Sequence, residues 1–523
     1  MLDMNDPNAP SSEIPAEPPV RQNHGPADAP IELPPAFVPE PPRPLVLGPA
    51  EPRARNLIIL ACTILCTIFA TVVFFVLEGV QAFFLLTHDR SENLDAPGEF
   101  IEHVVGRDLD LEEYAERRPD WEKQLDRLLG TEPGDTLEQA IEAYDDFIDN
   151  TETEWLRPRR TLAILLAEAG RFDEADQELS KLEYEESEQP FVAAVRFAYG
   201  DETLDLPLPR LDQVVALVNP QWARDKLIVR VAEKLGDQPA AGAAQARLDA
   251  RAKKLYDQTA PLNWGPWLLI VVGLVILLAW VICGLPRPQL AEGLTVSLWS
   301  VGRGYAVMIC AAALGIIIQY LLAFMLLENI PVLAGFGSLL AIVPLLVLAS
   351  WHLLRPWRLT LSSCFGLAVP LRRWGGLVLF TIALAGLDQL GTITIDALMN
   401  YLGIHMNWAE NPQELYLWKP WWIVWLDFMD GTVWAPICEE IGCRCFLYTT
   451  IRRKLPTLPA AILTGLIFGA AHFYSLSGFL QVAWSGFLWS LAYEKSRSLL
   501  PGMISHSLCN ILAFGGTILM YRV

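Results

Sequence analysis

The chain has 523 residues, of which 52% are hydrophobic, and its mean hydropathy of +0.30 implies several membrane spans. Its net charge is −21, and the segment Asp89–Gln258 alone carries 40 acidic and 21 basic residues, a net of −19. The acidity therefore belongs to one soluble block, and the rest of the chain is close to neutral. This balance argues against nucleic acid as a partner, because binding phosphates requires a basic surface.

The N-terminal part of the sequence divides into a tail and an anchor. Residues 1–55 are rich in proline without hydrophobic periodicity, which predicts disorder. The first apolar run begins near Leu57, too late for the core of a cleavable signal peptide, and it predicts a transmembrane anchor within 56–88. Arg53 and Arg55 precede this run and acidic residues follow it, so the positive-inside rule places the tail in the cytoplasm and the acidic block outside.

Residues 89–260 are predicted to form a soluble α-helical domain. The phrases LEQAIEAY, from Leu137, and FDEADQEL, from Phe172, lie 35 residues apart, and an Ala-Gly-Arg turn precedes the second. This spacing resembles a tetratricopeptide repeat, whose period is about 34 residues, with an unrelated helical bundle as the alternative. Further helices are expected at Trp222–Leu235 and Ala240–Tyr256. The charge of the domain predicts a solvated surface, and the domain itself is interpreted as a docking module for a protein partner.

Apolar sequence returns in the segments 261–400 and 401–523. The predicted spans are 264–284, 304–327, 333–354, 375–400, 421–447, 459–475, 478–494 and 499–519, which make nine with the first. Basic residues fall in alternate loops, as a cytoplasmic N-terminus requires, and Trp357–Pro370 is expected at the cytoplasmic interface. The predicted fold class is therefore all-α: a polytopic membrane protein of about nine transmembrane helices with an inserted soluble, tetratricopeptide-like domain.

Three polar islands interrupt the apolar sequence near the C-terminus. They occur in the strings CEEIGCRCF, IFGAAHF and SHSLCNI, and their polar side chains are those of Glu439, Glu440, Arg444, His472, His506 and Asn510. Such residues are costly at membrane depth and usually mark a site or a pathway. A helical rise of about 1.5 Å per residue places all three islands in the middle-to-cytoplasmic part of the bilayer. Together they predict an active site.

Helix geometry assigns partners within the islands. Glu440 and Arg444 are four residues apart and can pair on one helix face, which leaves Glu439 as a free carboxylate suited to accept a proton. His506 and Asn510 have the same spacing, so their side chains can point at one spot. Phe468 lies one turn before His472 and is expected to pack beside it.

The ordered motifs EExxxR, FxxxH and HxxxN resemble those of the CAAX protease and bacteriocin-processing family of intramembrane proteases. This family includes the type II prenyl-protein endopeptidases and bacterial members of abortive-infection or immunity type. The resemblance extends over roughly 290–523 and is strong from about Pro436 to Phe514. It departs from the family pattern at Cys443 and Cys445, where the family usually has Phe and Gly, so the packing around Arg444 is expected to differ.

The resemblance implies a role for each motif residue. Glu439 would be the general base that activates a water molecule, and His472 would orient it or share the proton. His506 and Asn510 would donate to the oxyanion of the tetrahedral intermediate, and Arg444 would hold Glu440. The resemblance thus implies an intramembrane endopeptidase without a metal or other cofactor, acting on membrane peptides or proteins, prenylated CAAX-like chain ends among them, in the cell (inner) membrane.

Three alternatives of other classes stay open. A zinc-dependent protease could use the two histidines and the glutamates, although the sequence lacks HExxH. A membrane scaffold or immunity protein could retain the fold without catalysis. A transporter would rest on Asp388, Asp427 and Asp430, each of which is better interpreted as a buried, hydrogen-bonded structural residue. Cys438 and Cys443 are interpreted as packing residues.

Overall fold

The structure is a computed structural model that describes most of the chain from the acidic domain to the C-terminus. The described residues are 64, 96–115, 117–129, 136–149, 156–200, 217–218, 221–283, 289–325, 331–404, 417, 420–472 and 474–522. The predicted tail, 1–55, and the predicted anchor, apart from Ile64, lie outside them. The described residues form helices and turns without a strand, which confirms the all-α class.

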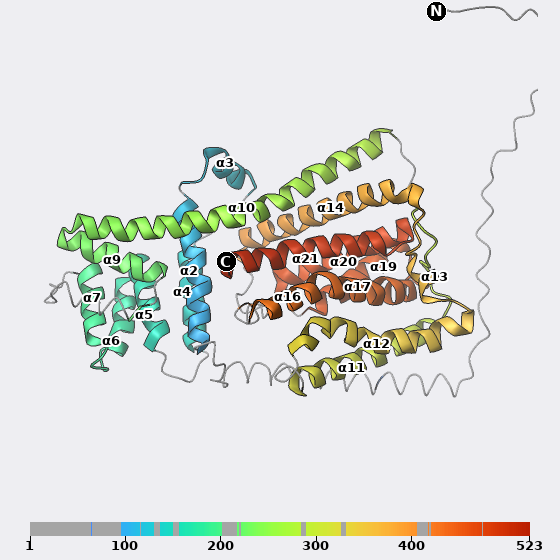
Figure 1. Ribbon diagram of the computed structural model, residues 1–523, viewed down its shortest axis with the longest axis horizontal. Helices are drawn as coiled ribbons and strands as arrows, with labels where there is room; N and C mark the ends of the chain where they lie inside the picture. Colours follow the sequence, from blue (N-terminus) through green and yellow to red (C-terminus); the bar gives the residue numbers. More distant parts are fainter. Residues whose placement is uncertain are drawn as a thin grey trace, which may run out of the picture. The chain divides into compact units, whose positions relative to one another are not determined.

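The acidic domain is built from short helices, of which α4 to α9 pack in sequence order (Figure 1). They are α2 (Ala96–Ala115), α3 (Asp120–Leu129), α4 (Thr136–Asp149), α5 (Leu156–Glu168), α6 (Phe172–Leu182), α7 (Gln189–Tyr199) and α9 (Trp222–Leu235). The buried face of α6 shows why they form. Ala175, Leu179 and Leu182 recur at helical spacing and join one apolar core, while Asp173, Glu174 and Asp176 face solvent.

The predicted helix–turn–helix unit is present as α5 and α6. Gly170 lies in the turn with φ +76°, a left-handed conformation that glycine adopts at least cost. Arg171 follows it and donates to Glu138 of α4 at 2.9 Å and to Glu174 of α6 at 2.7 Å. The two similar phrases therefore lie on helices joined by one arginine, and their assignment to the tetratricopeptide class stays a prediction.

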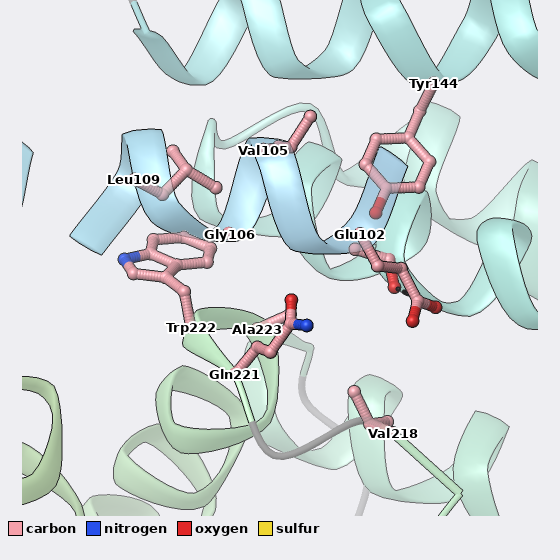
Figure 2. A pocket seen from close by; sticks show the side chains of 10 residues that line it. Glu102, Val105, Gly106, Leu109, Tyr144, Val218, Gln221, Trp222 and Ala223 are labelled. Atoms are coloured by element: carbon pink, nitrogen blue, oxygen red, sulfur yellow. Dashed lines mark hydrogen bonds between the residues drawn. The ribbon is translucent and has the colours of Figure 1, made fainter. Parts of the chain in front are cut away.

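A small cavity lies where α2 meets α4, α5 and the start of α9 (Figure 2). Glu102, Gly106 and Tyr144 line it together with Gln221 and Trp222. Its volume is about 10 Å³, which is room for about one water molecule. The cavity therefore fits a structural water and is too small for an organic ligand.

One helix of 46 residues, α10 (Gln238–Cys283), links the soluble domain to the membrane core. The sequence predicted two helices here, at 240–256 and 264–284, and this division was wrong. The residues between them contain Pro261 but no glycine, so nothing favours the left-handed turn that commonly ends a helix. Further along, α10 packs against α14 (Trp374–Tyr401), and a Cβ at Gly386 would lie 2.4 Å from the Leu269 carbonyl oxygen. Glycine at this position permits the close helix contact.

Five of the described helices are long and apolar enough to cross a membrane, so the nine predicted spans are confirmed only in part. They include α10, α14, α11 (Val301–Met325), α12 (Gly337–Ala349) with its continuation to Trp357, and α21 (Leu500–Tyr521). The predicted spans 459–475 and 478–494 correspond to α19 (Thr457–Ala470) and α20 (Leu476–Ser496). With 14 residues, α19 is shorter than a full span, and α20 carries several polar side chains that lower its hydropathy.

The segment predicted at the interface forms no span. A three-residue 3₁₀ turn, Arg355–Trp357, leads into it, and it contains the short helix α13 (Leu361–Phe365), which begins with a capping box between Thr360 and Ser363. The loop before α21 contacts this segment, since the Leu499 amide donates to the Phe365 carbonyl. The same loop contacts the loop before α11, since the Gly293 amide donates to the Arg497 carbonyl. Loops predicted on one side of the membrane are therefore held together by backbone hydrogen bonds.

Candidate active site

The first motif lies on a helix whose winding changes repeatedly. It comprises α16 (Trp421–Met429), η6 (Asp430–Trp434), α17 (Ala435–Glu440), η7 (Ile441–Tyr448) and α18 (Thr449–Arg452). Both η6 and η7 are π-helical, and they flank the short α-helical turn that ends with the two glutamates. Wide π turns of this kind are frequent at functional sites. The predicted span 421–447 is thus one helical segment, with a π turn before the two glutamates and another after them that contains Arg444.

The expected pair of Glu440 and Arg444 is present and fully buried. Arg444 Nη1 lies 3.1 Å from Glu440 Oε1, and the two side chains are 0% and 1% exposed. Arg444 Nη2 also donates to the Gly486 carbonyl at 3.3 Å. The guanidinium lies over the rings of Phe468 and Trp489, 4.5 and 5.1 Å from their centroids. An ion pair and two aromatic faces therefore stabilise a charge that has no access to water.

Glu439 is the accessible carboxylate of the motif, with 34% of its side chain exposed. Its Oε2 lies 4.0 Å from His472 Nε2 and 3.8 Å from His506 Nε2. These distances exceed a direct hydrogen bond. Among the described residues Oε2 has no hydrogen-bond partner, although the atom itself is buried. The structure thus brings Glu439 and both histidines together around one unpaired oxygen.

His472 lies in a turn beyond α19, so the predicted helix over 459–475 was too long. The backbone amide of His472 donates to the Gly469 carbonyl, while its ring Nδ1 lies 2.8 Å from the Phe468 carbonyl oxygen. In a continued α-helix the backbone amide of His472 would donate to the Phe468 carbonyl. The His472 ring binds this carbonyl instead, which accounts for the end of the helix. Since a carbonyl only accepts, Nδ1 carries a proton, and Nε2 faces Glu439; in the neutral ring Nε2 presents its lone pair to that carboxylate. Phe468 packs beside the ring as expected, at 4.8 Å between centroids.

His506 lies on α21 and faces both glutamates. Its Nδ1 is 3.4 Å from Glu440 Oε1, and its Nε2 points toward Glu439. Only 5% of the side chain is exposed. The helices approach closely here, because a Cβ at Gly502 would lie 2.6 Å from Glu440 Oε2. His506 therefore spans the buried and the accessible carboxylate.

Asn510, one turn further along α21, makes a different contact. Its Nδ2 donates to the Gly431 carbonyl at 2.8 Å and so ties α21 to the first motif helix. Nδ2 has a second hydrogen that this bond leaves available. In the structure, His506 is thus directed at the glutamates and Asn510 at a backbone carbonyl on η6, and the two do not share an acceptor.

The structure adds Trp489 of α20 to the candidate site, which sequence reasoning missed. Its ring stacks on His506 with centroids 4.0 Å apart and an interplanar angle of 23°. A tryptophan in an apolar helix is ordinary core, so the sequence holds no signal that would single it out. The contact of the Trp489 ring with side chains of the three motifs forms only when the helices that carry them pack together.

The aspartates of the transporter alternative make the contacts of structural residues. Asp388 is 1% exposed and accepts from Ser485 Oγ at 2.6 Å and from Cys509 Sγ at 3.0 Å, which joins α14 to α20 and α21. Asp430 accepts from Ser338 Oγ at 2.8 Å. Asp427 lines a small cavity between α16 and α21. Asp388 and Asp430 therefore join helices through hydrogen bonds, whereas Asp427 lines a cavity.

In the described part of the chain, no three His, Cys, Asp or Glu side chains are grouped as a metal site. The described cysteines are all free thiols, and Cys438 and Cys445 are buried.

Comparison with known proteins agrees with the motif geometry. Residues 420–512 match the family model described as type II CAAX prenyl endopeptidase Rce1-like, and this segment contains all six candidate residues. No curated protein and no solved structure matches the chain. The resemblance drawn from the three motifs is thus confirmed for this segment: residues 420–512 are similar to the CAAX protease family.

Proposed function

We propose that this protein is an intramembrane endopeptidase that hydrolyses a peptide bond with a water molecule activated by Glu439 and His472. The observation that carries the proposal is the unpaired Glu439 Oε2, which lies within 4.0 Å of both imidazole Nε2 atoms. A buried oxygen without a donor is costly. A water molecule that donates to it would remove that cost and would lie at the centre of the site.

The tautomer of His472 lets its Nε2 accept a hydrogen bond from this water molecule, beside the bond that Glu439 accepts. Glu439 Oε2 and the Nε2 lone pair of His472 are both acceptors, so one water molecule can donate one hydrogen to each. Its oxygen lone pairs then face away from both groups, toward an incoming carbonyl carbon. When the water attacks, Glu439 takes its proton and later returns it to the leaving amine, which is general base and then general acid catalysis.

The negative charge of the tetrahedral intermediate needs donors nearby. The remaining N–H of Asn510 and a proton on His506 would supply them, and the surrounding apolar helices would strengthen their effect. The buried Arg444–Glu440 pair carries no step of this reaction. It keeps the helix in register so that Glu439 is presented to the two histidines.

The substrate is a membrane peptide or protein whose scissile bond reaches this depth, with prenylated CAAX-like chain ends as one class. We further propose a multi-pass protein of the cell membrane with a cytoplasmic N-terminus and an extracytoplasmic acidic domain. The contact between His103 Nε2 and the Tyr521 carbonyl, at 2.7 Å, supports placing that domain and the end of α21 on one side. Protease added to intact cells should then cut the acidic domain and spare the tail; the reverse result would invert the topology.

The test compares membrane peptides in cells that carry the wild-type protein or Glu439→Ala, followed by cleavage assays on the purified proteins. Removing the base should lower kcat by roughly 10²–10⁴-fold. The variant should remain inserted and folded, because it loses an unpaired buried oxygen rather than a bonded one. Wild-type activity in Glu439→Ala would refute the proposed mechanism.

A further inference from the structure

Trp489 is a shared neighbour of the buried cation and of a motif histidine, and it is the ring that lies nearly parallel to that histidine. It lies on α20, is 3% exposed, and contacts side chains from three other helical segments. Arg444 lies over its ring at 5.1 Å, His506 stacks on it at 4.0 Å, and the Phe468 ring lies 5.9 Å away, edge to face. The indole is thus the surface on which these three groups are assembled.

The stack controls the orientation of the His506 ring. Rotation about the bond between Cβ and the imidazole has a broad energy profile, so a free histidine ring samples many planes. Here the indole lies nearly parallel to the ring, at 23°, and Phe468 presents its edge from another direction at 5.9 Å. In this plane Nδ1 points to Glu440 and Nε2 to Glu439. A rotated ring would lose one or both of these contacts.

The same ring supports Arg444. Among the described residues, Nε and Nη1 of this guanidinium make no hydrogen bond, although both atoms are buried. The faces of Trp489 and Phe468 take the place of acceptors, and cation–π attraction is strongest for desolvated groups of this kind. Arg444 and His506 are therefore both held by Trp489, the first through its charge and the second through its plane.

We infer that Trp489 is a positioning residue for the hydrolysis proposed above, on which this inference rests: it fixes the plane of His506 so that Nε2 faces Glu439. The indole Nε1 has no hydrogen-bond partner among the described residues, so the aromatic face, and not the N–H, does this. Another flat apolar ring should therefore replace it, whereas an aliphatic side chain should not.

The experiment measures kcat and KM on a membrane peptide for Trp489→Phe, Trp489→Leu and Trp489→Met. We expect Trp489→Leu and Trp489→Met to lower kcat by about 10–100-fold with little change in KM, since the catalytic group is misplaced and the substrate contacts are kept. Trp489→Phe should stay within about threefold of the wild type. Trp484→Leu is the matched control, because Trp484 lies on the same helix and packs on Phe487 instead.

A double-mutant cycle separates positioning from general loss of stability. If Trp489 acts through His506, Trp489→Leu should have no further effect in a His506→Ala background. Multiplicative effects, an unchanged kcat in Trp489→Leu, or a loss in Trp489→Phe equal to that in Trp489→Leu would each overturn the inference. If the leucine variant fails to fold, the methionine and phenylalanine variants decide.

Glu439→Gln is assayed in the same series to keep the two proposals apart. An active Glu439→Gln refutes the proposed function itself. An inactive Glu439→Gln together with wild-type kcat in Trp489→Leu refutes only the role of Trp489.

Discussion

The soluble domain and the membrane core both bury carboxylates, but they complete the hydrogen bonding of these groups to different degrees. Asp225 of α9 is fully buried; Arg247 Nε donates to its Oδ1 at 2.8 Å and Arg251 donates to its Oδ2. Glu188 likewise accepts from Arg160 through both of its oxygens. Each acceptor has a donor, so these groups are fully used in holding helices together.

In the membrane core, neighbouring polar atoms are left incomplete. Among the described residues, Glu439 Oε2, Glu440 Oε1 and His506 Nδ1 are all buried without a hydrogen bond of good geometry. Native proteins pair the great majority of their buried polar groups. These three atoms lie in one cluster, and Glu440 Oε1 takes part only in the ion pair with Arg444; we interpret their incomplete hydrogen bonding as the mark of a site. Incomplete pairing, and not buried charge as such, distinguishes the candidate site from the structural ion pairs.

The strongest test of this difference between the two regions is to remove one buried carboxylate from each and to compare the losses of stability. Glu440→Ala would strand Arg444, which is 0% exposed, and should destabilise the core by about 3–5 kcal/mol. Asp225→Ala should cost less, about 1–3 kcal/mol, because Arg247 and Arg251 are 47% and 28% exposed and can turn to water. Thermal unfolding in detergent measures both effects, followed by the reactivity of buried thiols for the membrane core and by circular dichroism for the soluble domain, whose sequence has no cysteine.

A double variant checks the reason for the larger effect. Glu440→Ala combined with Arg444→Leu removes both charges and should recover part of the stability that Glu440→Ala loses. If the single variant were as stable as the wild type, the membrane pair would be no more costly to break than a surface pair. The contrast between the two regions would then have to be abandoned.

Much of the candidate site was accessible from the sequence because polar residues inside apolar segments are themselves a signal. The pairing of Glu440 with Arg444 followed from helical spacing, and the contact of Phe468 with His472 did as well. The end of α19 did not, since it depends on a side chain capturing the Phe468 carbonyl. The role of Trp489 could not be predicted either, because a tryptophan in an apolar helix does not indicate that a histidine of another helix stacks on it.

The fold shows the same limit. The composition and periodicity of the chain indicated helices throughout and a soluble block between membrane segments. They did not reveal that α10 continues unbroken from that block into the core, since a proline reads equally as a kink or a boundary. Five of the predicted spans are confirmed among the described residues, and the helices that are short or carry polar motifs do not meet the length and hydropathy of a full span.

The contact between the acidic domain and α21 should depend on pH. Burial raises the pKa of Asp108 on α2 from 3.8 to about 7, and Tyr521 Oη, which lies 3.5 Å away, opposes this only weakly. A raised carboxyl pKa contributes stability when the group is neutral, and this contribution is lost as pH rises through about 7. The unfolding temperature of the domain should therefore fall between pH 6.5 and 8, by no more than about 4 °C.

Asp108→Asn should remove this dependence of the unfolding temperature on pH. His103 is a second titrating group nearby, but its effect on stability has the opposite direction with pH. Burial lowers the pKa of His103, so its contribution is lost only as pH falls below its ordinary value of 6.5. Above pH 6.5 the two groups are thus separated. A slope that persists in Asp108→Asn would assign the pH dependence to another group.

The smallest expected effect is that of chelators. They test whether Glu439 and the two histidines bind a water molecule or a metal ion. In the described residues no metal-binding group of three side chains is formed, and His472 already commits Nδ1 to a backbone carbonyl. Chelation of the purified protein should therefore leave its activity unchanged, and metal analysis should find no stoichiometric zinc. One zinc ion per chain that is lost together with activity in His472→Ala would instead make Glu439 and the histidines ligands. The unpaired oxygen would then be explained by a cation and not by an activated water molecule.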